Sequence, residues 1–302
     1  MGNAACCRNN PSFAEIASDI FNSHTNIATN QEDIRKEQST TTKAKIDLAY
    51  INLTEWSTSE RMARVQEIDY SPIALSMTNT FETRDLKITP KGIESSKRNL
   101  QDGVVYFGCK YKDLLGNYVV DVKCKLANEH FNNKFRGPHF MIYFDLTEHA
   151  YFLHDFPIGF GTFIKITEIY TLENDSLLSI GETFILVNIL YKNNEDTFPK
   201  LRLKIFRTGA LTEVYSFHAQ EFYMCRILIG RSKKCNVVID DGMISKIHAN
   251  VVFNNQKKWI IEDGTGDECS LNGMWVFANQ DFRIVENMEF KACESFFRVL
   301  SL

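Results

Sequence analysis

From about residue 78 to the C-terminus, short runs of Val, Ile, Phe and Tyr alternate with clusters of Asn, Gly and Asp. This pattern is typical of many short β-strands joined by tight turns. No long helical periodicity interrupts it. Residues 8–77 are polar and poorly periodic, with short helices predicted over 12–21 and 58–67, the second preceded by a capping box, Ser57-x-x-Glu60. Residues 23–45 are rich in Asn, Thr, Gln and Ser, which predicts disorder.

The β-rich region contains an internal repeat. The segment that starts at His139 matches the one that starts at His248, and three further matches follow in the same order with offsets between 108 and 113. Such a long, drifting offset indicates two homologous β-domains with loops of different length. The sequence therefore predicts an all-β protein with two tandem β-sandwiches. Its expected parts are a flexible tail (1–77), a central copy (78–192) and a C-terminal copy (193–302).

Composition narrows the classes of function. The chain has 302 residues, 44% hydrophobic and 24% charged, so it can bury real cores. Its net charge of −4 argues against a nucleic-acid-binding protein. No apolar run approaches the ~20 residues that a transmembrane helix needs, and the N-terminus lacks the features of a secretory signal.

The eight cysteines include no CxxC pair, so zinc-ribbon and thioredoxin motifs are excluded, and no metal or other cofactor is expected. The six later ones lie mostly in strand-like sequence and are expected to be small buried hydrophobes. The first two, Cys6 and Cys7, follow Met1 and Gly2 closely. Gly2 is a candidate for myristoylation and both cysteines for palmitoylation, two signals that together anchor a protein stably. This predicts a peripheral, lipid-anchored protein on the cytoplasmic face of a membrane.

The C-terminal copy carries a compact set of polar residues. Arg231 comes directly after Gly230 at the end of a hydrophobic strand. Ser245 and Lys246 precede another strand, and Asn272-Gly273 is a strong hairpin-turn signal. Loops cluster at the ends of a β-sandwich and carry its binding function. Arg and Ser can donate hydrogen bonds to phosphate oxygens, and Asn can bond a peptide backbone.

These residues resemble the forkhead-associated (FHA) domain over roughly 197–302. That family has Gly-Arg after an early strand, Ser-x-x-His before a later one and an Asn-Gly turn. The resemblance implies a β-sandwich that binds phosphothreonine peptides, with Arg231 and Ser245 on the phosphate, Lys246 beside them and Asn272 on the peptide backbone. It implies that the loops are supported by three structural residues, Gly230, His248 and Gly273.

Two departures from the family matter. Leu271 occupies a position where the family often has Thr or Ser, and Ser270 is a candidate to replace that hydroxyl. In the central copy the three key positions hold Cys109, Arg136 and Phe160 in place of Arg, Ser and Asn. Phosphate binding is therefore expected in the C-terminal copy only, and packing or protein interaction in the central one.

No nucleophile elbow, P-loop, HExxH or GxGxxG motif is present, so an enzyme is not expected. The sequence predicts a membrane-anchored adaptor that recruits phosphothreonine-containing proteins through the C-terminal copy. The alternative is a phosphate-independent scaffold in a cytoskeletal or ciliary assembly. Self-association, with a phosphorylated tail threonine docked on a second chain, is a third possibility.

Overall fold

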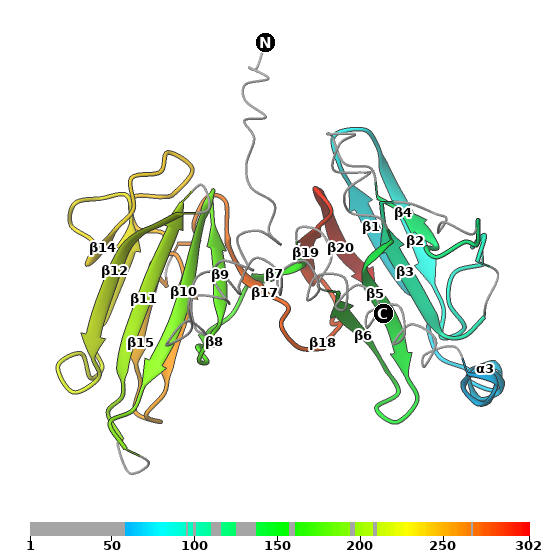
Figure 1. Ribbon diagram of the computed structural model, residues 1–302, viewed down its shortest axis with the longest axis horizontal. Helices are drawn as coiled ribbons and strands as arrows, with labels where there is room; N and C mark the ends of the chain where they lie inside the picture. The colour runs from blue at the N-terminus through cyan, green and yellow to red at the C-terminus, as the bar shows by residue number, and fades with distance from the viewer. Residues whose placement is uncertain are drawn as a thin grey trace, which may run out of the picture. The chain divides into compact units, whose positions relative to one another are not determined.

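The computed structural model describes residues 58–302 except 95, 99–100, 110–115, 125–136, 157–160, 194–196, 208–209 and 267. Within this part of the chain the protein is built of β-strands and one short helix, so the predicted all-β fold is confirmed (Figure 1). The described residues contain no helix long and apolar enough to cross a membrane.

Helix α3 (Ser59–Gln66) lies where the capping-box pattern predicts it. Its N-cap is Thr58, one residue later than that pattern implies, and the Thr58 side chain accepts from the backbone N–H of Arg61 at 3.2 Å. The first strand then begins at Ile73, five residues before the start expected from the sequence. Part of the predicted tail is therefore folded.

The described chain divides into two compact units. Unit 1 comprises Phe163–Phe277, and unit 2 comprises residues 58–162 together with Ala278–Leu302. Unit 2 is thus made of two separate segments, and the expected boundary at 192/193 falls inside unit 1.

Unit 1 is a sandwich of two sheets. One has the strand order β12-β11-β10-β9-β17-β7 and the other β14-β13-β15-β16-β8. The bounds of these strands are β7 (Phe163–Ile166), β8 (Tyr170–Thr171), β9 (Leu177–Ile180), β10 (Thr183–Leu190), β11 (Lys200–Arg207), β12 (Ala210–His218), β13 (Arg226–Gly230), β14 (Val237–Val238), β15 (Ala249–Phe253), β16 (Trp259–Asp263) and β17 (Met274–Phe277).

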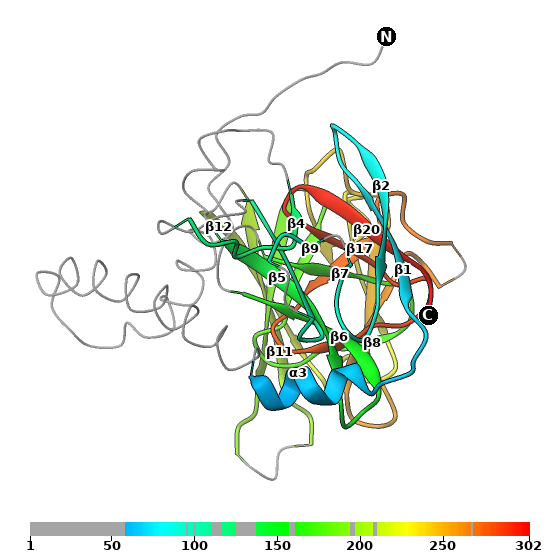
Figure 2. The same cartoon turned by 90° about the vertical axis from the view of Figure 1, so that its right-hand side faces the viewer.

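Unit 2 has one sheet with the order β19-β20-β1-β2 and another with β18-β6-β5-β3-β4. Figure 2 shows β20 beside β1, and the two strands pair antiparallel. The bounds are β1 (Ile73–Thr78), β2 (Thr83–Ile88), β3 (Val104–Gly108), β4 (Val122–Lys123), β5 (Pro138–Asp145), β6 (Ala150–Asp155), β18 (Phe282–Arg283), β19 (Glu289–Ala292) and β20 (Ser295–Ser301).

The two copies have exchanged their last three strands. Strand β8 of the central copy pairs with β16 of the C-terminal copy through Ile260↔Thr171, while β18 pairs with β6 through Arg283↔Phe152. Likewise β9 and β10 complete unit 1, and β19 and β20 complete unit 2. We call this arrangement the strand exchange. The repeat gives both copies the same strand pattern, so the pattern alone does not specify which copy supplies these strands.

The aromatic core of unit 2 depends on the exchange. Phe107 and Phe140, from β3 and β5, stack with ring centroids 4.4 Å apart. Phe290 and Phe297, from β19 and β20, stack at 4.7 Å, and the ring of Phe297 meets that of Phe140 edge-on at 5.4 Å. All four rings are buried. Two rings from each copy therefore form one core.

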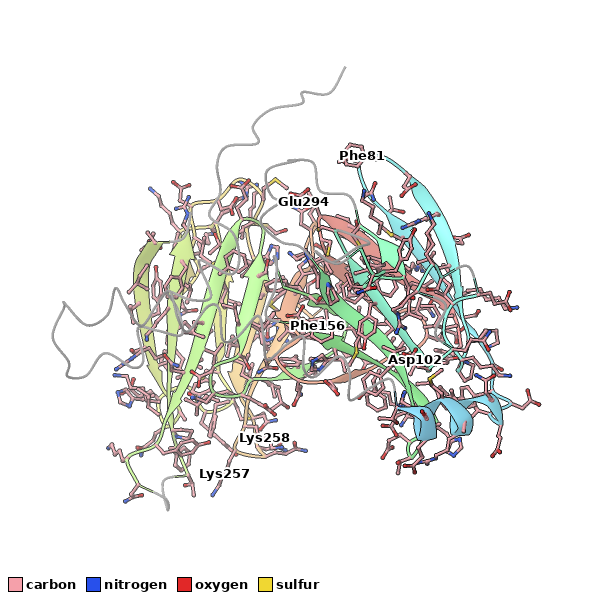
Figure 3. The ribbon with its side chains drawn as sticks, turned by 45° about the vertical axis from the view of Figure 1, so that its right-hand side comes forward. Phe81, Asp102, Phe156, Lys257, Lys258 and Glu294 are labelled. Carbon is pink, nitrogen blue, oxygen red and sulfur yellow. The ribbon has the colours of Figure 1, made fainter. Side chains whose placement is uncertain are left out.

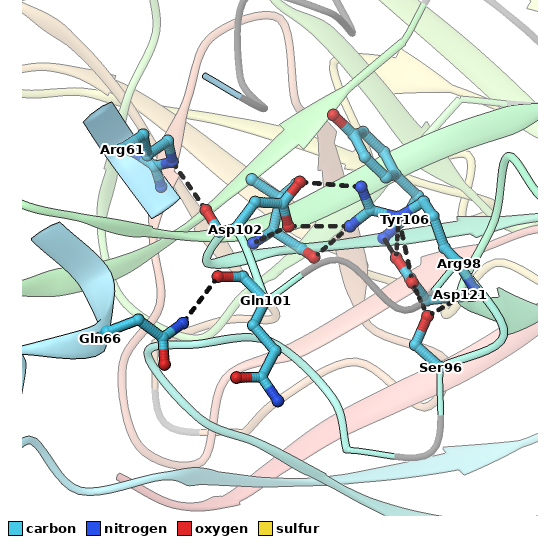
Figure 4. A network of polar contacts seen from close by, with 9 residues as sticks. Arg61, Gln66, Ser96, Arg98, Gln101, Asp102, Tyr106 and Asp121 are labelled. Carbon is cyan, nitrogen blue, oxygen red and sulfur yellow. Dashed lines mark hydrogen bonds and ion pairs between the residues drawn. The ribbon is translucent and has the colours of Figure 1, made fainter. Parts of the chain in front are cut away.

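A buried polar network fixes the loop before β3 (Figure 4). Arg98 makes two hydrogen bonds to Asp102, at 2.8 and 2.9 Å, and a third contact to Asp121 at 3.1 Å. The carbonyl of Asp102 accepts from Arg61 of α3 at 2.9 Å, which ties the helix to the sandwich. Burial acts to lower the pKa of Arg98, but the two carboxylates raise it above its ordinary value. One guanidinium thus neutralises two buried carboxylates.

Candidate phosphate-binding loops

Three loops of unit 1 follow β13, β14 and β16, and we call them the apical loops. Gly230 ends β13 where the chain passes very close to the second loop. A Cβ at this position would lie 2.4 Å from the carbonyl oxygen of Lys246, so only glycine fits. The backbone N–H of Arg231 donates to the Ser245 carbonyl at 3.1 Å, and that of Ser232 donates to Lys246 at 3.1 Å. These bonds hold Arg231 beside Ser245 and Lys246.

The third apical loop joins this pair through Ser245. The backbone N–H of Leu271 donates to the Ser245 hydroxyl oxygen at 3.1 Å. The Ser245 hydroxyl therefore accepts from the protein, and its own proton can be donated to a ligand. The side chain of Leu271 points away from the protein and is 88% exposed.

His248 links the second and third loops from inside the sandwich. Its Nδ1 accepts from the backbone N–H of Ser245 at 3.1 Å, so the ring proton lies on Nε2, which donates to the Gly273 carbonyl at 3.1 Å. The side chain is fully buried, and burial lowers the pKa of His248. The neutral ring is the form that suits both bonds. Gly273 itself has a φ of +69°, which glycine adopts without strain.

Asn272 lies beside the second loop. Its Nδ2 donates to the carbonyl of Met243 at 2.7 Å, which orients the amide. The Oδ1 atom of the same amide can accept a peptide N–H. The four residues expected to bind a phosphopeptide are thus on loops bonded to one another: Arg231, Ser245, Lys246 and Asn272.

Ser270 is not placed to replace the hydroxyl missing at Leu271. Its Oγ donates to Asp263 at 2.6 Å and lies 3.2 Å from Nε2 of His248. The Ser270 proton is therefore used inside the loop. The same contacts argue against a catalytic triad of Ser245, His248 and Asp263. Asp263 bonds Ser270 rather than His248, and Ser245 meets His248 through its backbone N–H and not through its hydroxyl.

The structure adds basic residues that the sequence motifs do not include. Lys233 and Lys234 are exposed on the first apical loop, as Arg231 is, and Lys246 is exposed on the second. The Lys165 side chain, from β7, lies against Gly273 and over the ring of Trp275, with Nζ 5.9 Å from the ring centroid. Positive charge is therefore concentrated on the first apical loop, whereas the second carries Asp240 and Asp241 besides Lys246. A charge count of each loop would have found the two lysines, whereas Lys165 needed the fold.

The equivalent position in unit 2 lacks the arginine. Gly108 ends β3 as Gly230 ends β13, and the parallel pairs Gly108↔Lys123 and Gly230↔Val238 are equivalent. Cys109 therefore stands where unit 1 has Arg231. Arg136 and Phe160, the other two substituted positions, lie outside the described residues.

The remaining sequence predictions concern cysteines. Of the six later ones, Cys109, Cys124, Cys235 and Cys293 are buried as expected, whereas Cys225 and Cys269 are exposed, so the prediction is wrong for those two. Gly2, Cys6 and Cys7, the predicted acylation sites, lie outside the described residues.

The fold and the loops define a β-sandwich that gathers basic and hydroxyl side chains at one end. The family model described as FHA domain matches residues 227–290, and this match supports the resemblance of the C-terminal copy to that family. The match begins in β13 and ends in β19, so it contains all four residues expected to bind a phosphopeptide. No curated protein and no solved structure matches the chain.

Proposed function

We propose that this protein is an adaptor whose apical loops in unit 1 bind phosphothreonine-containing partners. The FHA match suggests a phosphopeptide-binding interaction module. The assignment of phosphothreonine binding to these residues is supported by the hydrogen bonds between the three loops. These bonds hold the loops that carry Arg231, Ser245 and Asn272 next to one another.

In this proposal each residue has a separate task. The Arg231 guanidinium and the Ser245 hydroxyl donate to phosphate oxygens, and Lys246 adds positive charge nearby. Asn272 bonds the peptide backbone and sets its register. Recognition of this kind is switched by a kinase acting on the partner. It should weaken as salt is raised, because the charged groups are exposed to solvent.

The test is a titration of the full chain with a degenerate phosphothreonine peptide library and its unphosphorylated counterpart. Arg231→Ala should weaken binding about 10-fold to 150-fold, which corresponds to about 1.5–3 kcal/mol for a charged hydrogen bond. Lys258→Ala is the matched control: it removes the same charge from an exposed position in the turn after β15 (Figure 3). The β15 strand starts next to His248 and runs away from the apical loops, so this control should bind normally.

Equal binding of the two libraries would contradict the proposal. A phosphate-independent scaffold would then account better for the fold. Light scattering before and after phosphatase treatment tests the self-association proposal, in which a phosphorylated threonine of one chain occupies the loops of another. An unchanged size would contradict it.

The proposal includes a lipid anchor at the N-terminus. Its support is the sequence alone, in which Gly2 follows Met1 and two cysteines follow closely. Gly2→Ala should move the protein from the membrane to the soluble fraction of a eukaryotic cell, and Cys6→Ser with Cys7→Ser should do the same, because one acyl chain binds only marginally. Unchanged fractionation of both variants would contradict the anchor.

A further inference from the structure

Unit 2 contains a cluster of three thiols and one imidazole next to the position equivalent to the apical loops. Nδ1 of His139 lies 3.0 Å from Sγ of Cys293 and 3.9 Å from Sγ of Cys109. These three ligand atoms all lie within 4.8 Å of one another. The thiol of Cys124 interacts electrostatically with that of Cys293 but lies outside this group of three mutually close ligand atoms. We call the four residues the thiol–histidine cluster: Cys109, Cys124, His139 and Cys293.

We propose that the thiol–histidine cluster is a structural zinc site. Cysteine sulfur and histidine nitrogen are the ligands that Zn²⁺ prefers, and three cysteines with one histidine form a known structural set. With Zn–S bonds of about 2.3 Å and Zn–N bonds of about 2.0 Å, neighbouring ligand atoms in a tetrahedron lie roughly 3.5–3.8 Å apart. The observed separations of 3.0 and 3.9 Å bracket this range.

The burial of the cluster fits a structural site and not a catalytic one. None of the four side chains is more than 3% exposed. A catalytic zinc keeps an open position for water or substrate, whereas a structural zinc is enclosed by four protein ligands.

Comparison with unit 1 shows that the sandwich itself does not require these thiols. Cys124 donates its backbone N–H to Gly108, as Ile239 does to Gly230, so the two positions are equivalent. Cys293 occupies the turn between β19 and β20, where unit 1 has Gly181 between β9 and β10. Since Arg231 is equivalent to Cys109, the three cysteine positions of unit 2 hold an arginine, an isoleucine and a glycine in unit 1.

The histidine is shared by both units but contacts different groups. His248 of unit 1 bonds the backbone of the apical loops, whereas Nδ1 of His139 faces two thiols. The Nδ1 atom of this histidine therefore meets a backbone N–H in unit 1 and sulfur in unit 2.

The backbone at Cys293 is a second sign that the thiol is required. Its φ is +51°, in the left-handed region, where the equivalent Gly181 has +57°. A cysteine in this conformation costs free energy that glycine avoids. Glu294, the next residue of this turn, has a φ of +56°. A metal bond to the Cys293 thiol would offset part of the cost of this turn.

The proposed site also bears on the strand exchange. Three of its ligands come from the central copy, and Cys293 comes with the exchanged strands β19 and β20. Glu294, the next residue, marks this turn in Figure 3. A bound zinc would hold the exchanged hairpin to the rest of unit 2, and metal binding would add to the stability of the fold.

The experiment uses the untagged full chain produced in bacteria, loaded with ZnSO₄ and dialysed against a weak chelator. Metal analysis should find about one zinc per chain, and Co²⁺ in its place should give the absorption of a tetrahedral thiolate site. Cys293→Gly should lose the metal while remaining folded by circular dichroism, because glycine suits this turn. The matched controls Cys225→Ser and Cys269→Ser, which change exposed thiols of unit 1, should keep it.

Two outcomes would overturn the proposal. The first is a chain that retains no zinc, or equal zinc in Cys293→Gly and in the controls. The second is a count of two missing thiols in denatured, freshly purified protein with no reductant, which would indicate a disulfide between Cys109 and Cys293. If Cys293→Gly does not fold, Cys109→Ser and the cobalt spectrum decide the question in its place.

Discussion

The strand exchange predicts that two fragments of the chain stay associated after the backbone is cut between the two copies. A protease site placed between Leu190 and Lys200 separates β10 from β11. The N-terminal fragment then carries β8–β10 of unit 1, and the C-terminal fragment carries β18–β20 of unit 2. Each fragment is expected to hold the other, because each completes the other's sandwich.

The size of the effect follows from burial. Strands β9 and β10 contribute six apolar side chains to unit 1 that are at most 1% exposed: Leu177, Leu178, Ile180, Ile185, Leu186 and Val187. Burial of such a side chain stabilises by about 1.5–3 kcal/mol, so the six amount to roughly 9–18 kcal/mol. That is as large as the whole stability of a typical domain, about 5–15 kcal/mol. Unit 2 loses Phe290, Phe297 and Val299 in addition, so separation requires both units to unfold.

A cross-link shows which strands are paired. Thr171→Cys with Ile260→Cys places two thiols across β8 and β16, which pair in the exchanged structure. The matched control is Thr171→Cys with Phe152→Cys, the pair that β8 would form with β6 if each copy kept its own strands, since Phe152 pairs with Arg283 here. After oxidation and cleavage, the first variant should run as one band on a non-reducing denaturing gel. Both thiols of the control lie on the N-terminal fragment, so its cross-link is measured by a free-thiol count, which oxidation should leave unchanged.

The reasoning would be refuted if the cut fragments separated on size exclusion under native conditions, or if the control pair cross-linked and the first pair did not. Either result would restore the consecutive sandwiches that the repeat suggests. Cleavage is verified on a reducing gel of the same samples.

Three further predictions follow. Arg98→Met should lower the free energy of unfolding by about 3–5 kcal/mol in urea denaturation, because it leaves two buried carboxylates without their cation; an unchanged midpoint would contradict the network in Figure 4. Leu271→Thr should tighten phosphothreonine binding roughly 10-fold or more by adding a hydroxyl beside the phosphate, while Leu271→Ala should not; equal affinities would place the phosphate elsewhere. Burial lowers the pKa of His248, so below the ordinary histidine pKa of about 6.5 the unfolded chain binds more protons than the folded one. The free energy of unfolding should therefore fall from pH 7 to pH 5.5, and it should fall by less in His248→Gln.

The sequence predicted the all-β fold, which the structure confirms, and it named candidate loop residues whose binding role stays a prediction. The alternation of apolar and turn residues indicated short strands, and the Gly-Arg, Ser-x-x-His and Asn-Gly motifs placed the candidate site, because these features depend on a few neighbouring residues. The strand exchange could not be predicted in this way. It is a choice between β8–β10 and β18–β20, which have similar patterns, and the hydrophobic periodicity is satisfied by either.

The thiol–histidine cluster was missed for a related reason. Zinc motifs are found in a sequence by closely spaced pairs of ligands, but Cys109, Cys124 and His139 are fifteen residues apart and Cys293 is at the other end of the chain. Only the fold, with its exchanged strands, brings Cys293 to the other three. Ser270 shows the opposite case, because a residue with suitable chemistry is directed inward by its bond to Asp263.

The central claim is that the apical loops of unit 1 hold a phosphate group through Arg231. Phosphorus NMR of a phosphothreonine peptide selected from the library tests this most directly, because the signal comes from the phosphate itself. The account predicts that the full chain shifts and broadens the resonance, that Lys258→Ala does so equally, and that Arg231→Ala at the same concentrations shifts it much less. A resonance that moves equally with the wild type and with Arg231→Ala, or with neither, would contradict the account.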